Sequence, residues 1–356
     1  MKKIFLQMPS SVFANNVIFQ NIDANNATFR WYLLKSKLES LGYELVTADN
    51  HDLKDCEGII FHDANSLDSS FKPLNLKGYI KKLLGIKAAP DYPTRRLYEE
   101  AVNAGLIDKL IFFIWESNTV CPLNFSPKIL NKFNKVMSWD DDLLKKSKFI
   151  RYCMPMENPD FTHSFIPFNQ KKLLTMISFN KFSSEQNELY SARRNDALYF
   201  DTNYPNDFDL YGKRWNVPIT RLQRLLPFLV KKYTTYRGHV KNKLETLSKY
   251  KFNLCYENDA GAKGWVTEKI FDSLLAGIVP IYWGASNIEE YVDSDVFIDR
   301  RKFKKISDLA DFITKMTEEE YNKYISAAER YKKSDKYAKF LPESFCDTMI
   351  KTLELK

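Results

Sequence analysis

The stretch FNLCYENDAGAKGWVTEKIFDSLLAGIVPIYWG, Phe252 to Gly284, decides the fold class of this chain. Two apolar segments flank a polar loop and an amphipathic helix, a pattern typical of neighbouring strands in a parallel sheet. The helix is expected from Glu268 to about Ala276, with Thr267 as its N-cap and Gly277 after its end. The loop and first turn hold a cluster of polar residues, namely Glu257, Asn258, Lys263, Thr267, Glu268 and Lys269.

The start of this helix is a candidate anion site. Free N–H groups and the helix dipole attract anions there, and the sheet's carboxyl edge lies at the same end. A cation in the first turn, such as Lys269, opposes the dipole by a few tenths of a kcal/mol unless an anionic ligand is bound. The alternative is that Lys269 points to solvent and that Glu257-Asn258 is a surface turn.

On both sides of this stretch, apolar strands alternate with helical segments. Before it, the sequence predicts strands at KIFLQM, YELVTA, GIIFHD, KLIFFIWES and KVMSWD, and helices at 28–41 and 94–105. The segment 154–172 contains three prolines and reads as a linker. The fold class is therefore α/β, with Rossmann-like domains at 1–165 and 166–335 facing a cleft, and a helical tail at 336–356. Ligands of such folds bind at the carboxyl ends of the strands, so we expect the site in that cleft.

Composition limits the classes of function. The chain has 356 residues and a net charge of +8, which favours an anionic partner, but no nucleic-acid reading motif accompanies the charge. Basic clusters near Lys81 and Arg301 read as solvated faces. The five cysteines form no C-x-x-C pair, which argues against a disulfide framework and a zinc site. No window approaches the roughly 18 apolar residues of a membrane span, so a cytoplasmic protein is expected.

Three further positions could carry chemistry. Arg193 lies in a predicted helix after the first strand of the second domain, where a guanidinium can bind phosphate oxygens; a solvated pair with Arg194 is the alternative. Glu116 follows an apolar strand in the first domain and is a candidate general base, or a solubilising strand end. The run Asp140–Asp142 resembles a D-x-D metal motif, but helix capping is favoured because a helical run follows.

The segment from Tyr236 to Gly284 closely resembles the donor-binding signature of the α-1,3/4-fucosyltransferase family, bacterial type. The matching features are E-N, then T-E-K, then a helix and V-P-I-Y-W-G. YGKRWN, Tyr211 to Asn216, and the Arg193 helix also fit, whereas the first domain resembles the family only loosely. The resemblance implies a GT-B type glycosyltransferase with GDP-fucose as donor and inversion at the anomeric carbon.

The resemblance also implies roles for individual residues. Glu116 would be the catalytic base, and Glu268 would act beside the sugar. The donor-binding residues would be Arg193, Tyr211, Gly212, Glu257, Asn258, Trp265, Thr267 and Lys269. No metal would be obligatory, although a divalent cation can stimulate such an enzyme.

The expected acceptor is an N-acetylglucosamine-containing oligosaccharide or polysaccharide, linked α-1,3 or α-1,4. Peripheral contact of the basic C-terminal helices with an inner membrane is a further expectation. Two alternatives stay open: transfer from another sugar nucleotide, and glycan binding without catalysis.

Overall fold

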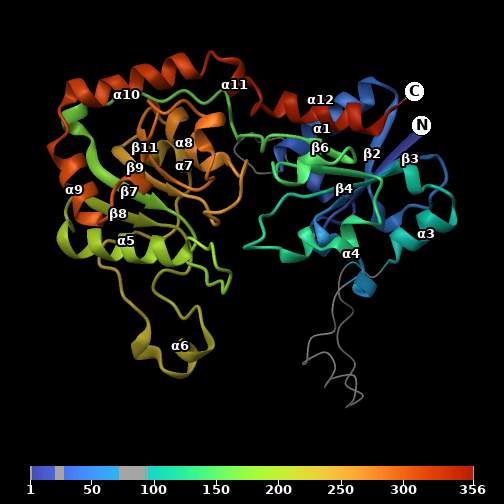
Figure 1. Ribbon diagram of the computed structural model, residues 1–356, viewed down its shortest axis with the longest axis horizontal. Helices are drawn as coiled ribbons and strands as arrows, with labels where there is room; N and C mark the ends of the chain where they lie inside the picture. Colours follow the sequence, from blue (N-terminus) through green and yellow to red (C-terminus); the bar gives the residue numbers. More distant parts are fainter. Residues whose placement is uncertain (1, 21–27, 72–92, 94, 356) are drawn as a thin grey trace. The chain divides into compact units, whose positions relative to one another are not determined.

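The computed structural model describes residues 2–20, 28–71, 93 and 95–355, and the chain divides into two compact units (Figure 1). Unit 1 comprises residues 1–153 together with 342–356, and unit 2 comprises residues 154–341. The boundaries expected from the sequence lay at 165/166 and 335/336. The residues around Lys81 and the predicted helix start at Thr94 lie outside the described residues.

Unit 1 is built on a sheet of six parallel strands in the order β2-β1-β3-β4-β5-β6. The strands are β1 (Lys2–Gln7), β2 (Tyr43–Thr47), β3 (Cys56–His62), β4 (Leu110–Phe113), β5 (Lys135–Ser138) and β6 (Phe149–Arg151). The helices are α1 (Phe29–Ser40), α3 (Leu97–Asn103), α4 (Pro127–Leu130) and α12 (Pro342–Leu353). Strand β6 was not expected, because its three residues are too few to show a periodic pattern.

The last helix, α12, packs on α1 within unit 1. Phe345 of α12 is fully buried, and its ring lies 5.8 Å from Trp31 of α1 and 5.7 Å from Phe113 of β4, centroid to centroid. Aromatic rings at such separations contribute attraction beyond their buried area. The end of the sequence therefore completes the core of the unit that contains its beginning.

Unit 2 is built on a sheet of five parallel strands in the order β11-β10-β9-β7-β8. The strands are β7 (Lys172–Ile177), β8 (Phe208–Tyr211), β9 (Tyr250–Tyr256), β10 (Val279–Trp283) and β11 (Ile298–Asp299). The helices are α5 (Tyr190–Asn203), α6 (Arg221–Leu225), α7 (Lys243–Leu247), α8 (Glu268–Leu275), α9 (Ile306–Lys315), α10 (Glu318–Tyr331) and α11 (Asp335–Ala338). Two parallel sheets confirm the expected α/β class.

The strand order of unit 2 predicts where a ligand binds. The chain runs from β7 outward to β8 and then returns to β9 on the other side of β7, so the order reverses between β7 and β9. Open parallel sheets bind ligands outside the carboxyl ends of the strands at such a switch point. The residues that follow β9 are Glu257 and Asn258. The opening stretch of sequence therefore lies at the position that the topology favours.

Candidate active site

A buried carboxylate organises the end of β9. Glu257 is 0% exposed, and its backbone N–H donates to the Trp283 carbonyl at 2.8 Å. Its carboxylate accepts hydrogen bonds from both the N–H and the hydroxyl of Thr267 at 2.9 Å, and Lys269 Nζ lies 3.1 Å away. Thr267 occupies the N-cap position of α8, but its side chain binds Glu257 instead of capping the helix. The surface-turn alternative for Glu257 is therefore wrong.

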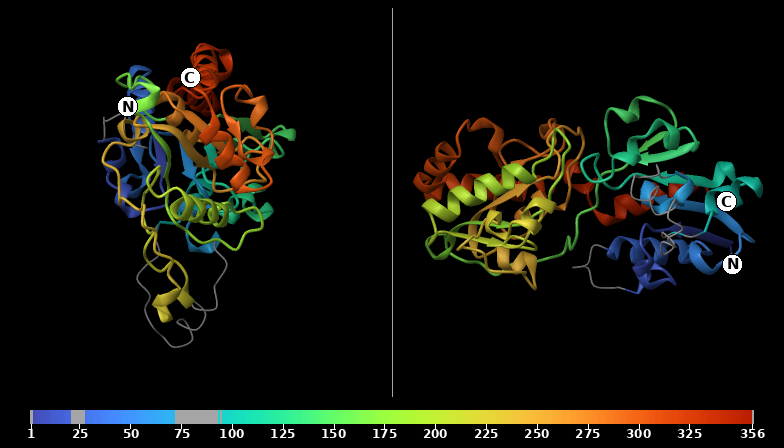
Figure 2. Two further views of the ribbon diagram at one scale, coloured as in Figure 1. Left: turned by 90° about the vertical axis from the view of Figure 1, so that its left-hand side faces the viewer. Right: turned by 90° about the horizontal axis from the view of Figure 1, so that it is seen from below.

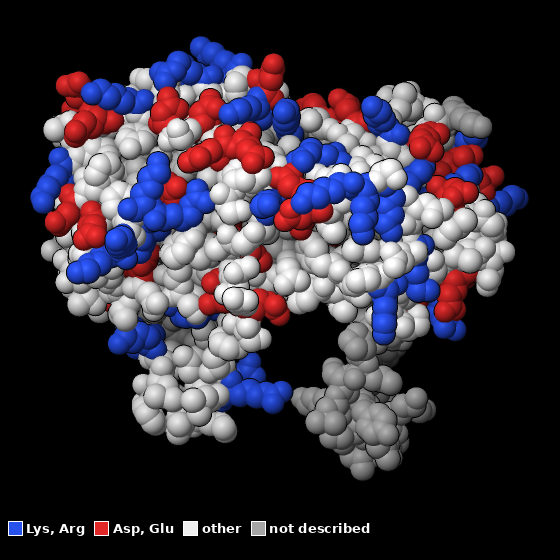
Figure 3. Space-filling model, in the orientation of Figure 1, with Lys and Arg blue, Asp and Glu red and all other residues white. Residues whose placement is uncertain are grey.

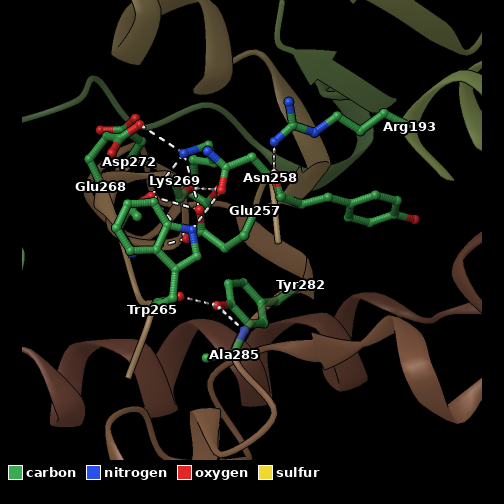
Figure 4. A network of polar contacts seen from close by, with 12 residues as sticks. Arg193, Glu257, Asn258, Trp265, Glu268, Lys269, Asp272, Tyr282 and Ala285 are labelled. Carbon is green, nitrogen blue, oxygen red and sulfur yellow. Dashed lines mark hydrogen bonds and ion pairs between the residues drawn. The ribbon is translucent and has the colours of Figure 1, made fainter. Parts of the chain in front are cut away.

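Gly284 leaves the space that Glu257 fills. A Cβ added to Gly284 would lie 2.4 Å from Glu257 Cγ and 2.4 Å from the Tyr282 hydroxyl oxygen. That hydroxyl donates to the Trp265 carbonyl at 3.3 Å and accepts from the Ala285 N–H at 3.1 Å (Figure 4). Neither Tyr282 nor Gly284 was singled out from the sequence, although both belong to the quoted V-P-I-Y-W-G motif.

Lys269 lies between two carboxylates at the start of α8. Its Nζ is 3.1 Å from Glu257 and 3.3 Å from Glu268, and it donates to the Thr267 hydroxyl at 2.9 Å (Figure 4). Burial lowers the pKa of Lys269, but the two carboxylates outweigh it and the net pKa is raised. The two acids thus explain why a cation occupies a first turn where the dipole disfavours it. About a quarter of the Lys269 and Glu268 side chains stays exposed, 26% and 27%, so the pair is open to a ligand.

A second charged layer lies behind this pair. Lys243 of α7 forms an ion pair with the buried Asp272 of α8. Burial raises the pKa of Glu268, but Lys269 and Lys243 together outweigh it and lower the pKa, so Glu268 is an anion at neutral pH. Burial also lowers the pKa of Lys243, but Asp272 and Glu268 outweigh it and the pKa is raised. Lys243 and Asp272 were not predicted from the sequence, because a Lys at one helix start and an Asp inside another show no shared pattern.

Asn258 and Trp265 contact each other beside the cluster. The indole N–H of Trp265 donates to Asn258 Oδ1 at 2.8 Å, and the Trp265 side chain is only 2% exposed. The expected donor-binding roles of Asn258 and Trp265 stay predictions.

Arg193 lies inside α5 with its guanidinium aimed at the end of β9. It is 4% exposed, and its Nη2 donates to the Tyr256 carbonyl, the residue before Glu257, at 2.7 Å. Its Nε has no hydrogen-bond partner among the described residues. Arg194 instead donates to the Lys181 carbonyl and, at 2.8 Å, to the Ser191 hydroxyl. The two arginines are therefore not a solvated pair, and only Arg193 is directed toward the Glu257 cluster.

Tyr211 and Gly212 contact other parts of the sheet. The Tyr211 hydroxyl lies 3.0 Å from the Tyr250 hydroxyl, at the start of β9. Gly212 has φ +119°, and an added Cβ would lie 1.9 Å from the Ser178 carbonyl oxygen, so only glycine fits. These contacts give both residues a structural role, and their part in donor binding stays a prediction.

Glu116 belongs to unit 1 and follows β4, which ends at Phe113, four residues earlier than expected. A buried carboxylate, Asp63, holds this loop. Asp63 Oδ1 accepts from the N–H groups of Trp115 at 2.7 Å and Glu116 at 3.1 Å, and from Asn124 Nδ2 at 2.7 Å. Asp63 was not predicted from the sequence, although an aspartate directly after strand β3 is a signal of the same kind as Glu116.

The Asp140–Asp142 run has local partners. Asp140 Oδ1 accepts from the N–H groups of Asp142 at 2.8 Å and Leu143 at 3.2 Å, at the start of a 3₁₀ turn. Asp140 therefore stabilises a local turn, but the expected helix cap is not formed, because Asp142, the N-cap residue of the 3₁₀ turn, makes no side-chain capping bond. Among the residues that the structure describes, no group of three or more His, Cys, Asp or Glu is placed to hold a metal ion. In the same part of the chain, no helix is long and apolar enough to cross a bilayer.

Known proteins share both the sequence of this site and the fold around it. Residues 209–354 match the family model described as glycosyltransferase family 10 (fucosyltransferase), C-terminal. An α-(1,3)-fucosyltransferase of Helicobacter pylori is 44% identical over 75 residues, and an α-(1,4)-fucosyltransferase of Arabidopsis thaliana is 43% identical over 70. These matches cover 21% and 20% of this chain, and 16% and 17% of those relatives.

Solved structures match over the whole chain. A crystal structure of an α1,3-fucosyltransferase has a TM-score of 0.57 and 17% identity, covering 99% of this chain and 90% of that one. The Anabaena protein HepE, solved with UDP and glucose, has a TM-score of 0.53 and 12% identity, covering 99% of this chain and 100% of that one. At these identities the likeness concerns the fold, and the expected GT-B type is confirmed. The residues that form the Glu257 cluster thus lie in the segment that matches the family 10 C-terminal model, and over residues 209–354 this chain resembles the fucosyltransferases of that family.

Proposed function

We propose that this protein transfers L-fucose from GDP-fucose to a hydroxyl of an N-acetylglucosamine-containing glycan, with inversion and in α-1,3 or α-1,4 linkage. The observation that carries the proposal is the position of Lys269. It lies at the switch point of a Rossmann-like sheet, between Glu257 and Glu268, within the family-matched segment. A similar fold solved as an α1,3-fucosyltransferase with GDP-fucose supports the choice of donor.

The charges in unit 2 suit a diphosphate leaving group. Lys269 is about a quarter exposed, and the buried Arg193 keeps one N–H without a hydrogen-bond partner among the described residues. The first turn of α8 lacks a cap from the Thr267 side chain, so its N–H groups can donate to an anion. Cations and N–H groups that are held in place before the reaction stabilise charge that develops on the leaving phosphate. With these donors present, we propose that transfer needs no divalent metal.

The proposed reaction is a single displacement. The acceptor oxygen forms a bond to the anomeric carbon, the bond from that carbon to the phosphate oxygen breaks, and GDP leaves with the bonding electrons. Glu116 takes the proton of the acceptor hydroxyl as general base. The sugar gains oxocarbenium character, and the anionic carboxylate of Glu268 stabilises that positive charge. One base is sufficient because no covalent sugar-enzyme intermediate forms.

The decisive experiment measures nucleotide release and identifies the product. The protein is incubated with GDP-fucose, GDP-mannose or UDP-glucose and a panel of N-acetylglucosamine-containing acceptors, with and without EDTA. We expect acceptor-dependent GDP release from GDP-fucose alone, survival of that release in EDTA, and an α-linked product whose linkage is read by NMR.

Each other outcome removes a specific part of the proposal. Release from a different sugar nucleotide would replace the donor, and saturable glycan binding without release would indicate a lectin-like role. Complete loss in EDTA, restored only by a divalent ion, would overturn metal independence.

A further inference from the structure

The segment from Val217 to Lys232, called here the α6 segment, exposes a dense group of apolar side chains. It contains α6 and a 3₁₀ turn, Pro227–Leu229, and it projects from the sheet of unit 2 (Figures 1 and 2). The exposed fractions are 58% for Leu222, 79% for Leu225, 38% for Leu226, 80% for Phe228 and 42% for Leu229. Single exposed apolar residues are normal, but a contiguous group marks an interaction surface.

The base of this segment is firmly held. Trp215 is 1% exposed, its indole N–H donates to the Ser178 carbonyl at 2.8 Å, and its ring lies 5.2 Å from that of Tyr233. The Tyr233 N–H donates to Asn216 Oδ1 at 2.9 Å, which brings the two ends of the segment together. The structure therefore presents the exposed side chains on an ordered base.

The start of α6 is ordered as well. A capping box joins Thr220 and Gln223: the Gln223 N–H donates to the Thr220 hydroxyl at 3.2 Å, and Gln223 Oε1 accepts from the Thr220 N–H at 3.3 Å. Such reciprocal bonds satisfy N–H groups that the first helical turn leaves open. The apolar side chains that follow, Leu225 and Phe228, are thus displayed by formed turns.

The charge of this region has one sign. Between Asp209 and Glu245 the sequence contains nine Lys and Arg and no acidic residue. Arg221, Arg224 and Lys231 are exposed and lie within three residues of the apolar side chains. Figure 3 shows blue and white atoms, and no red ones, over this projection on the face in view. The apolar side chains of this surface would contact an apolar interior, and its Lys and Arg side chains would contact an anionic face above that interior.

A second copy of this chain offers a poorer match. Unit 2 has an open groove between α9 and α10, with apolar side chains that include Phe312 and Met316. Three of the five carboxylates that line this groove have cationic partners, and the other two, Asp308 and Glu320, accept backbone hydrogen bonds at the starts of α9 and α10. The pairs are Asp295 with Arg330 at 3.1 Å, Asp311 with Lys315 at 3.4 Å and Glu319 with Lys323 at 3.2 Å. The groove therefore supplies little free negative charge for the cations of the α6 segment.

We propose that the α6 segment docks on the surface of an anionic phospholipid bilayer. Leu225 and Phe228 enter the boundary between headgroups and acyl chains, while Arg221, Arg224 and Lys231 bind the lipid phosphates. This site differs from the C-terminal helices that the sequence suggested for membrane contact. There, Lys332 pairs with Glu329 and Lys336 with Asp293, and the large apolar residues Tyr331 and Tyr337 are buried.

The test is co-sedimentation of the full chain with phosphatidylcholine vesicles, with and without phosphatidylglycerol, at low and high salt. We expect binding only to the anionic vesicles and its loss at high salt, since screening weakens exposed charges. L225S/F228S should abolish binding, and R221Q/R224Q should weaken it about 30-fold, because each basic residue near the surface contributes about fivefold. Phe165→Ser, at a position 84% exposed, and K333Q/K339Q, at exposed positions in the turns after α10 and α11, are the matched controls and should bind normally.

Three outcomes would overturn the proposal. The first is no binding to anionic vesicles at low salt, and the second is unchanged binding by L225S/F228S. The third is a wild-type oligomer in solution that becomes monomeric in L225S/F228S without any vesicle binding, which would assign the surface to a second copy. Circular dichroism and thermal unfolding of every variant check that it is folded, independently of any transferase activity.

Discussion

At the residue scale, the unusual feature is that the buried carboxylate of Glu257 fixes the position of the partly exposed Lys269. Glu257 has no exposed surface, yet its carboxylate receives Thr267 and Lys269. Burial raises the pKa of Glu257, and Lys269 partly opposes that rise. The position of Lys269 therefore depends on a residue that a ligand in front of α8 need not touch.

This dependence predicts different effects on stability and on donor use. Lys269→Met leaves the carboxylate of Glu257 buried without its cation, and breaking a buried pair typically destabilises by about 3–5 kcal/mol. In the double variant Glu257→Gln/Lys269→Met the buried charge is gone, so most of the stability should return. Use of GDP-fucose should stay at least tenfold impaired, since a charged hydrogen bond contributes roughly 1.5–3 kcal/mol.

Urea unfolding and steady-state kinetics of the single and double variants measure the two effects separately. Recovery of donor use together with stability in the double variant would show that Lys269 has only a structural role.

Arg193 and Arg194 form a natural matched pair for the donor site. Arg193→Ala removes a buried guanidinium directed at the end of β9, whereas Arg194→Ala removes one bound to local acceptors. We expect tenfold or greater loss of kcat/KM for GDP-fucose in Arg193→Ala and less than threefold in Arg194→Ala. Equal losses in the two variants would contradict a role of Arg193 at the phosphates.

Glu116 is the predicted general base. Glu116→Gln keeps the shape of the side chain but cannot take a proton, so kcat should fall by about 10²–10⁴-fold while GDP-fucose binding is retained. Discontinuous assays of fucose transfer measure kcat, and isothermal titration calorimetry measures the binding of GDP-fucose. Transfer at the wild-type rate would place the base elsewhere.

At the element scale, Asp209 shows how strand order creates a stabilising contact. It lies on β8, and its carboxylate accepts from Lys172 of β7 at 2.6 Å, from Tyr250 of β9 at 2.7 Å and from Arg237 at 2.7 Å. Burial would raise the pKa of Asp209, but these hydrogen bonds outweigh it and lower the pKa below its ordinary value of 3.8. One side chain thus joins three of the five strands of unit 2.

The lowered pKa gives a pH-dependent prediction. Stabilisation by the Asp209 carboxylate is present above about pH 3.8 and is lost as pH falls through the lower folded-state pKa. Asp209→Asn should therefore be destabilised by roughly 2 kcal/mol or more at pH 7, and the difference from wild type should shrink toward pH 3. Urea unfolding at both pH values measures it, with the exposed Asp207→Asn as control. A difference that stays constant with pH would contradict the assignment.

Most elements of this fold were predictable because their sequences are strongly periodic. The strands β1, β3 and β9 are apolar runs, and α8 has a clear start at Thr267 and a glycine after its end. Strand β4 ends four residues early because Asp63 binds the N–H groups that would have continued it, and no local pattern shows that long-range contact.

The candidate site was predictable to the extent that it is local in sequence. Glu257, Thr267 and Lys269 lie within thirteen residues of one another, and a single motif contains them. Lys243, Asp272 and Asp63 act through contacts between separate elements, so only the fold reveals them. The supporting residues were therefore missed more often than the residues they support.

At the scale of the whole molecule, α12 returns the chain to unit 1. Phe345→Ala should lower the free energy of unfolding of unit 1 by about 3–5 kcal/mol, since a large ring leaves a cavity among Trp31, Phe113 and Tyr152. Unit 2 should keep its stabilisation by GDP-fucose. Calorimetry with and without the donor tests this, with Phe312→Ala, 41% exposed, as the matched control. Loss of donor-dependent stabilisation in Phe345→Ala would contradict the prediction that this substitution affects unit 1 alone.

The return of α12 also affects how the protein is made. Unit 2 occupies residues 154–341, and unit 1 is completed only by residues that follow it. A ribosome therefore releases every residue of unit 2 before it releases the helix that covers Trp31 and Phe113. Domains usually fold in the order in which they are synthesised, but here the nascent first unit holds an open aromatic surface until the last helix emerges. The second unit to appear is the first that can finish folding.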